Sequence, residues 1–213
     1  MNKSRIYLAS DSTCQTYTKA DYPQAGWGQF LPLYITDFNI ENHAIGGRSS
    51  KTFIEEGRLA QILEEISEND YLIIQMGHND STKERPARYT EPYNDYKKYL
   101  KQYIQGAQEK LAIPILVTPV TRLHYVNGEF LKDFGDYCNA IKEVAEEEDV
   151  LLIDLMTLSN RHLQSIGYDK AKEYYMCAIN GEDCTHFTTK GADQMAKLIA
   201  LQLHANLSRC NRP

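Results

Sequence analysis

Four short segments of the sequence carry side chains that could together cleave an ester. Ser12 follows an apolar run, and a strand ending there would place its hydroxyl at the carboxyl edge of a sheet, where open α/β folds bind their ligands. Asp183 precedes His186 by three residues, so its carboxylate could hold one imidazole nitrogen and leave the other free as a base. A serine activated by such a pair is a nucleophile for acyl transfer.

Two further segments could stabilise the oxygen that becomes negatively charged in such a reaction. The adjacent glycines Gly46 and Gly47 follow the second apolar run, and residues without a Cβ let backbone N–H groups approach a ligand closely. Asn79, which follows the third run, could add a side-chain amide. The backbone N–H groups of Ser12 and Gly47 and the Asn79 amide would form an oxyanion hole, in which each donor is worth roughly 2.7–4 kcal/mol.

Each of these residues also has an ordinary structural explanation. Ser12 and Asn79 are of types common in turns, and Gly46 and Gly47 fit a tight connection from strand to helix. A histidine in a loop, such as His186, is usually a surface or structural residue. The chemical interpretation therefore depends on the four segments meeting at one place.

The pattern of apolar residues predicts the elements that would bring them together. Continuous or alternating apolar runs indicate strands near residues 6–10, 38–42, 71–76, 113–117 and 150–154. Helical spacing between and after them indicates helices near residues 53–66, 93–111, 134–147, 155–166 and 189–207. Strands separated by helix-length crossovers predict an α/β fold with a parallel sheet and helices on both faces. Without repeats or linkers, residues 1–213 are expected to form one domain.

Composition and charge argue against several other classes of protein. The formal net charge of the 213 residues is -6, which disfavours a nucleic-acid partner. No apolar stretch is long enough to cross a bilayer, so we expect no membrane span. Residues 1–5 lead into the first expected strand without a signal-peptide core, which predicts a cytoplasmic protein.

The cysteines fit the same compartment. They number five and are scattered over Cys14, Cys138, Cys177, Cys184 and Cys210, without the paired spacing of a zinc site. We therefore expect reduced thiols and no bound metal or cofactor. A bridge between Cys177 and Cys184 is close enough in sequence to form but is not favoured.

The four segments resemble, in order and spacing, the motifs of the SGNH (GDSL-like) hydrolases. They are Ser10-Asp11-Ser12-Thr13, Gly46-Gly47-Arg48-Ser49, Gly77-His78-Asn79-Asp80 and Asp183-Cys184-Thr185-His186. The resemblance extends from Ile6 to the final helix and is greatest to the rhamnogalacturonan acetylesterase group, which carries similar Gly-Trp-Gly-Gln, Gly-Arg-Ser and Gly-His-Asn-Asp segments.

This resemblance implies a three-layer α/β/α, flavodoxin-like fold and metal-free deacetylation of plant-polysaccharide sugars. The family's nucleophile, oxyanion glycine, oxyanion asparagine and Asp/His pair fall on Ser12, Gly47, Asn79, Asp183 and His186. The choice of Gly47 over Gly46 rests on the Gly-Arg-Ser spacing. Ser10 replaces the glycine that usually stands two positions before the nucleophile, and its side chain must fit at a crowded turn.

The function that these motifs indicate is a serine O-acetylesterase acting on pectin-derived (rhamnogalacturonan) or xylan-derived oligosaccharides. Trp27, Arg48 and His78 are candidate contacts to the sugar, although Trp27 could equally be a core or lid residue and Arg48 an ion-pair partner. Residues 82–92 and 124–132 could cover the site. The oligomeric state is left open by the sequence.

Three other functions remain as alternatives. One is a broad-specificity short-chain esterase or a lipase- or thioesterase-like enzyme of the same superfamily. Another is a non-catalytic carbohydrate-binding protein, which the complete set of motif residues disfavours. A metal-dependent hydrolase using His78, Asp80 and His186 has little support, because no cluster has zinc-site spacing.

Overall fold

The centre of the molecule is a parallel sheet of five strands. The computed structural model describes the backbone of residues 3–210 and the side chains of residues 3–206. The strands are β1 (Arg5–Ser10), β3 (Asn39–Asn42), β4 (Tyr71–Gln75), β5 (Ile113–Val117) and β8 (Leu151–Ile153). Their order across the sheet is β3-β1-β4-β5-β8, and each neighbouring pair is parallel. The predicted five-stranded parallel sheet is confirmed.

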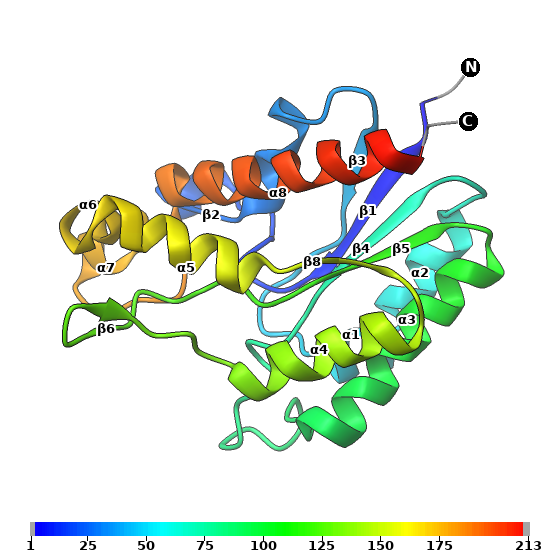
Figure 1. Cartoon of the computed structure of the whole chain (residues 1–213), viewed down its shortest axis with the longest axis horizontal. Coiled ribbons are helices and arrows are strands. Elements are labelled where there is room, and N and C mark those ends of the chain that lie inside the picture. Colours follow the sequence, from blue (N-terminus) through cyan, green and yellow to red (C-terminus); the bar gives the residue numbers. More distant parts are fainter. Residues whose placement is uncertain (1–2, 211–213) are drawn as a thin grey trace.

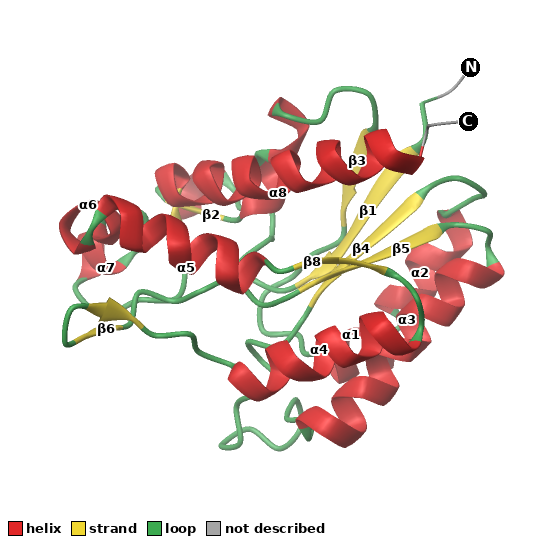
Figure 2. Cartoon of the chain, in the orientation of Figure 1, coloured by secondary structure: helices red, strands yellow, loops and turns green. Residues whose placement is uncertain are grey.

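Helices cover both faces of this sheet (Figures 1 and 2). Successive side chains of a strand point to opposite faces. In β1, Ile6 and Leu8 accordingly pack into one apolar cluster and Tyr7 and Ala9 into another. The first cluster includes α5 (Leu155–Ile166) and α8 (Thr189–Cys210). The second includes α1 (Ser50–Glu55), α2 (Arg58–Glu65), α3 (Lys97–Glu109) and α4 (Gly135–Glu147). The expected α/β/α layering is thus confirmed.

The strand order also determines where a site can form. Counted in chain order along the sheet, the strands run 2-1-3-4-5, as in flavodoxin-like folds. The connection from β1 leads to one side and those from β3 onward to the other, so the carboxyl ends of β1 and β4 border a crevice. Residues 11–13 and 77–80 follow these two strand ends.

Several short elements lie outside the predicted pattern. The helix expected over residues 53–66 is divided into α1 and α2, because Gly57 adopts a left-handed conformation with φ of 76°. Pro92–Tyr96 forms a π-helical turn ahead of α3. The remaining short elements are 3-10 turns at Lys19–Asp21, Trp27–Gln29 and Leu31–Leu33, α6 (Tyr168–Lys172), α7 (Cys177–Asn180) and a hairpin of β6 (Tyr125–Val126) and β7 (Glu129–Phe130).

Two very short strands join segments that are distant in the sequence. β2 (Gln24–Ala25) pairs antiparallel with β9 (Phe187–Thr188), and the N–H of Thr189 donates to the Pro23 carbonyl at 2.8 Å. Because β9 starts one residue after His186, this pairing anchors the histidine to the segment that follows β1.

The cysteines with described side chains, Cys14, Cys138, Cys177 and Cys184, are free thiols. Cys210 lies outside the residues whose side chains are described. Cys177 and Cys184 are hydrogen-bond partners, and burial together with this contact raises the pKa of Cys177 to about 11. Within residues 3–210, no helix is long and apolar enough to span a bilayer.

Candidate active site

Ser12, His186 and Asp183 form a continuous hydrogen-bonded chain. The Ser12 hydroxyl lies 2.9 Å from Nε2 of His186, and Nδ1 of the same ring lies 2.7 Å from Oδ2 of Asp183. Ser12 lies in the turn that follows β1, whereas the other two residues lie between α7 and β9. The carboxylate accepts from Nδ1–H, which leaves Nε2 as an acceptor for the serine proton.

Asp183 is held ionised and in one orientation by its own loop. Its Oδ1 accepts from the backbone N–H groups of Thr185 and His186, each at 3.0 Å. Burial by itself would raise the pKa of Asp183, but these bonds and the imidazole contact outweigh it and hold the pKa below its ordinary value. An ionised carboxylate at this position stabilises a positively charged imidazolium.

Three hydrogen-bond donors border the Ser12 hydroxyl. Within the described part of the chain, the backbone N–H groups of Ser12 and Gly47 have no acceptor. The Asn79 amide nitrogen donates to the Arg48 carbonyl at 2.9 Å, which uses one of its two hydrogens. This leaves two backbone donors and one side-chain donor available for a developing negative charge.

The environment of the two glycines favours Gly47 over Gly46 as the donor. The N–H of Gly46 is already bound to Oε1 of Gln15. Gly47 has a φ of 81°, which a residue with a Cβ rarely adopts, and this conformation leaves its N–H unbonded. The bond from Gly46 to Gln15 therefore supports the choice of Gly47 that the Gly-Arg-Ser spacing indicated.

Trp27 is a core residue, one of the two alternatives that the sequence left open, and does not reach the cavity as a substrate contact. The side chain is fully buried, and its Nε1–H donates to Oε1 of Gln75 at 2.9 Å. Nε2 of Gln75 donates to the Thr13 hydroxyl, which in turn donates to Asp11. The indole thus terminates a buried polar network under the nucleophile turn, because a buried N–H needs an acceptor.

His78 is the other end of this network. Its Nε2 lies 3.0 Å from the Val120 carbonyl, and its Nδ1 lies 3.2 Å from Oδ2 of Asp11. Both ring nitrogens therefore face oxygen atoms of the protein. Burial would raise the pKa of Asp11, but the charge of His78 and the bonds from Thr13 hold it below its ordinary value. His78 borders the active-site cavity, yet only 4% of its surface is exposed.

Arg48 is engaged in structural contacts and is absent from the cavity lining, which agrees with the alternative of an ion-pair partner. Its Nε forms an ion pair with Glu56 at 2.9 Å, and Nη1 donates to the Gly46 carbonyl at 2.8 Å. The side chain thereby fixes the carbonyl of the glycine turn. Ser10 also fits its position: the buried hydroxyl donates to the Gln75 carbonyl at 2.8 Å.

Asp80 ties together the loops around Asn79. Its carboxylate accepts from the N–H and hydroxyl of Ser50 and from the Thr90 hydroxyl. Complete burial raises the pKa of Asp80 to about 6. With His78 bound to Val120 and Asp11, these side chains act as structural partners, and residues 3–206 contain no cluster of three or more metal-ligating side chains.

A cavity of about 510 Å³ opens over the Ser12 hydroxyl. It is lined by Ser12, Gln15, Tyr17, Gly46, Gly47, His78, Asn79, Arg85, Arg88, Arg122, Asp183, Thr185 and His186. Gln15, Tyr17 and the three arginines were not predicted from the sequence. Arg85 and Arg88 come from residues 82–92, which were expected to cover the site, and their spacing of three was the only available signal. Residues 124–132 do not line the cavity.

Comparison with known proteins agrees with this geometry. Residues 8–199 match the family model described as GDSL-like lipase/acylhydrolase. The chain is 56% identical over 198 residues, covering 92% of this chain and 91% of the other, to a Bacillus subtilis protein named probable rhamnogalacturonan acetylesterase YesY. It is 38% identical, over 92% of this chain and 88% of the other, to rhamnogalacturonan acetylesterase RhgT of the same organism.

A solved structure has the same fold. The crystal structure of the Bacillus subtilis protein YxiM superimposes with a TM-score of 0.86 at 32% identity, and the match covers 97% of this chain and 57% of that chain. The match over residues 8–199 agrees with the strand order and with the serine and histidine at the sheet edge. The chain belongs to the GDSL-like lipase/acylhydrolase family.

Proposed function

We propose that the protein is a serine esterase that removes O-acetyl groups from plant-polysaccharide-derived oligosaccharides. The observation that carries the proposal is the chain of hydrogen bonds from Ser12 through His186 to Asp183, beside backbone N–H groups without an acceptor. The names of the relatives YesY and RhgT support acetylated rhamnogalacturonan as the kind of substrate. We also propose that residues 1–213 form a single esterase domain.

Acylation follows from this arrangement. The Ser12 oxygen attacks the acetyl carbonyl carbon while its proton passes to Nε2 of His186, and Asp183 stabilises the imidazolium. The carbonyl oxygen becomes an oxyanion that accepts hydrogen bonds from the N–H groups of Ser12 and Gly47 and from the Asn79 amide. Collapse of this intermediate breaks the ester bond, and His186 returns the proton to the sugar oxygen.

Deacylation repeats the same steps with water as the nucleophile. A water molecule gives its proton to Nε2 of His186 and attacks the acetyl group on Ser12. The second tetrahedral intermediate uses the same three donors. Its collapse releases acetate and returns the proton to the Ser12 oxygen.

The decisive experiment measures acetate release from acetylated rhamnogalacturonan and xylo-oligosaccharides, together with hydrolysis of p-nitrophenyl esters of increasing chain length. An acetylesterase releases acetate from at least one sugar and loses activity as the acyl chain lengthens. Preference for octanoate over acetate would instead identify a lipase- or thioesterase-like enzyme. Absence of all turnover would favour a carbohydrate-binding protein.

The Ser12→Ala variant tests the nucleophile within the same assay. We expect at least about a 10⁴-fold loss of kcat with an unchanged Tm, because only a part-buried hydroxyl is removed. A variant as active as the parent protein would refute the role of Ser12.

We further propose a cytoplasmic location, supported by the adjacent free thiols of Cys177 and Cys184. To test this location, the thiols are alkylated in intact cells before lysis. Both cysteines should be modified without prior reduction. A Cys177–Cys184 disulfide in the cells would contradict this location.

A further inference from the structure

Three arginines, Arg85, Arg88 and Arg122, line the cavity above the nucleophile and are called here the arginine cluster. Within residues 3–206, none of them forms an ion pair with a carboxylate. Asp183 is the acidic residue that lines this cavity, and it is bound to His186. The chain as a whole has a net charge of -6. The cavity is therefore a concentration of positive charge on an acidic protein.

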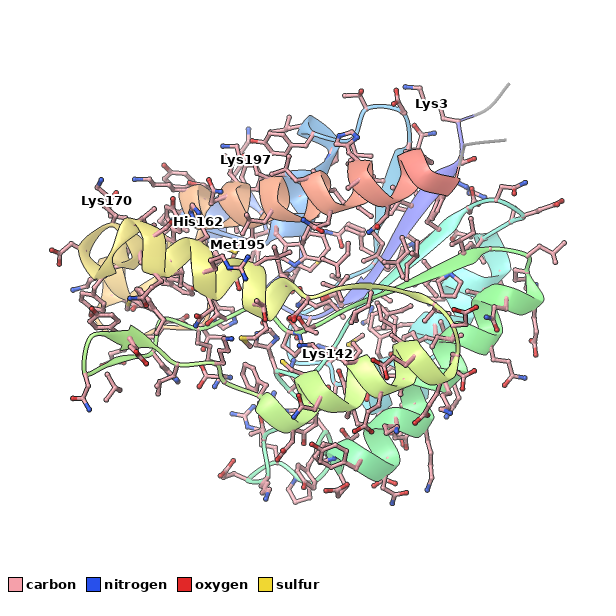
Figure 3. All side chains as sticks on the ribbon, in the orientation of Figure 1. Lys3, Lys142, His162, Lys170, Met195 and Lys197 are labelled. Carbon is pink, nitrogen blue, oxygen red and sulfur yellow. The ribbon has the colours of Figure 1, made fainter. Side chains whose placement is uncertain are left out.

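Several basic side chains elsewhere in residues 3–206 form ion pairs with carboxylates, in contrast to the three arginines of the cluster. Lys142 on α4 and Lys197 on α8, both labelled in Figure 3, bind Asp154 and Asp193 at 2.6 and 2.7 Å. Lys97 likewise pairs with carboxylates of α4. The absence of such partners at the cavity leaves its guanidinium groups free to bind an anion.

The cluster also contains buried donors without acceptors. The Nε–H groups of Arg88 and Arg122 are inaccessible to solvent and have no hydrogen-bond partner among the described residues. Nη2 of Arg88 bonds only to the Thr82 hydroxyl at 3.2 Å, and the Arg122 guanidinium lies 4.6 Å above the Phe134 ring. The guanidinium groups of both arginines, which line the cavity, therefore keep hydrogen-bonding capacity that no carboxylate of the described residues uses.

Backbone hydrogen bonds hold the segments that carry the cluster beside the cavity. The Arg85 carbonyl accepts from the N–H groups of Arg88 and Tyr89, a single helical turn that brings the Arg85 and Arg88 side chains to one side. Nη1 of Arg88 lies 3.9 Å from where a Cβ on Gly47 would stand. On the other side of the cavity, Arg122 adjoins the catalytic loop, because Leu123 N–H donates to the Cys184 carbonyl.

We propose that Arg88 and Arg122, with Arg85 at the mouth, bind the carboxylate of a uronic acid in the substrate and thereby select acidic over neutral acetylated sugars. This inference rests on the proposed function and specifies its substrate class. The guanidinium fork matches a carboxylate in a bidentate manner, and such charge-assisted hydrogen bonds are strong. Among the sugars of plant polysaccharides, the uronate carboxylate is the group that meets these requirements, and a neutral xylo-oligosaccharide lacks it.

The test compares kcat/KM for an acetylated galacturonate-containing oligosaccharide with that for a neutral acetylated xylo-oligosaccharide. In the unaltered protein we expect this ratio to favour the uronate and to fall as NaCl is raised, because salt screens the pairing. Arg88→Gln and Arg122→Gln should each lower the ratio by roughly 10- to 100-fold, mainly through KM for the acidic sugar. Arg88→Lys, which keeps the charge but not the fork, should give an intermediate ratio.

Arg161→Gln is the matched control. Arg161 is an exposed arginine of α5 away from the cavity lining, so its substitution should leave the ratio unchanged. Melting temperatures identify any variant that fails to fold, and Arg85→Gln, in an exposed position, then serves as the second variant. For Arg85→Gln we expect a smaller drop in the ratio.

Three outcomes would overturn the inference. An equal loss on acidic and neutral sugars means that the arginines act on the reaction centre and not on a substrate carboxylate. A change in the inhibition constant of acetate without a change in the ratio means that the cluster holds the released product. If none of the three substitutions changes the ratio, the arginines do not form a binding site for a substrate carboxylate. Failure of the proposed function looks different: neither sugar is deacetylated by the unaltered protein.

Discussion

At the scale of one residue, replacing Asn79 measures how much one donor of the oxyanion hole contributes to kcat. Replacement by alanine removes an amide that lies beside Ser12 and donates to the Arg48 carbonyl. We expect kcat to fall about 100- to 1000-fold with little change in KM, because the lost bond strengthens only in the transition state.

Asn160 is the matched control for this variant. Its amide also donates to a backbone carbonyl, that of Phe130 at 3.0 Å, but it lies on α5 away from the cavity. Asn160→Ala should cost stability without lowering kcat. A similar kcat loss in both variants would show that a general loosening of the fold explains the effect.

The Trp27→Phe variant distinguishes between two roles of Trp27, packing in the core and contact with the substrate. The substitution leaves Oε1 of Gln75 buried without its donor, which costs about 1–3 kcal/mol of unfolding free energy. We expect urea denaturation to show this loss while KM for acetylated sugars stays unchanged. A raised KM with unaltered stability would restore Trp27 to the substrate site.

Residue types at strand ends made part of the site predictable. Ser12, Gly47, Asn79, Asp183 and His186 could be named because each occupies a recognisable motif. Trp27 stayed undecided because an indole suits a sugar platform and a core equally, and its burial and its bond to Gln75 decide between them. Arg85 and Arg122 lie in irregular loops with no periodic signal, and their convergence depends on tertiary structure.

At the scale of elements, Asp80 in the loop after β4 is bonded to the start of α1 and to the segment ahead of the π-helical turn. Its carboxyl group makes the stability of the fold depend on pH. It accepts bonds from Ser50 at the start of α1 and from Thr90 ahead of the π-helical turn. Its folded pKa of about 6 lies above the ordinary value of 3.8, so the folded protein binds this proton more tightly than the unfolded chain. This contribution to stability is present below pH 3.8 and is lost as the pH rises through 6.

Asp80→Asn should remove this dependence. From pH 4 to pH 7, the unfolding free energy of the parent protein should fall relative to that of the variant by on the order of 3 kcal/mol. Chemical denaturation of both proteins at several pH values gives the difference. A difference that stays constant with pH would mean that Asp80 has an unshifted pKa in the folded protein.

The long elements were predictable and the short ones were not. Five strands could be located because buried apolar runs such as residues 71–76 have few alternative explanations. The division of the helix at Gly57 depends on one left-handed residue, which apolar spacing does not reveal. β2 and β9 have two residues each, too few for any periodicity, and they exist because residues distant in the sequence meet.

At the scale of the whole molecule, Gly191 determines how closely α8 packs on the rest of the fold. A Cβ built there would lie 2.1 Å from the Tyr174 carbonyl oxygen, so a side chain forces the helix away. Gly191→Ala should destabilise the protein by about 1–3 kcal/mol and lower kcat, because α8 follows directly on β9 and His186.

Gly135→Ala provides the comparison. No atom lies within 4 Å of a Cβ at Gly135, the first residue of α4, so we expect an unchanged or slightly raised Tm. Thermal unfolding and esterase assays on the two variants distinguish steric displacement of α8 from a general effect of removing glycine. Equal destabilisation of both would contradict the assignment of close packing to Gly191.

The pairing of β2 with β9 has a consequence for the order of events during folding. Ser12 and His186 are 174 residues apart in the chain, and their contact requires that the last segment close onto one near the beginning. Contacts of such long range form slowly, because loop closure costs entropy before any contact is gained. During synthesis the nucleophile emerges 174 residues before its base. Recovery of esterase activity after dilution from denaturant therefore reports the rate of this closure. It should be slower than the recovery of helical circular dichroism.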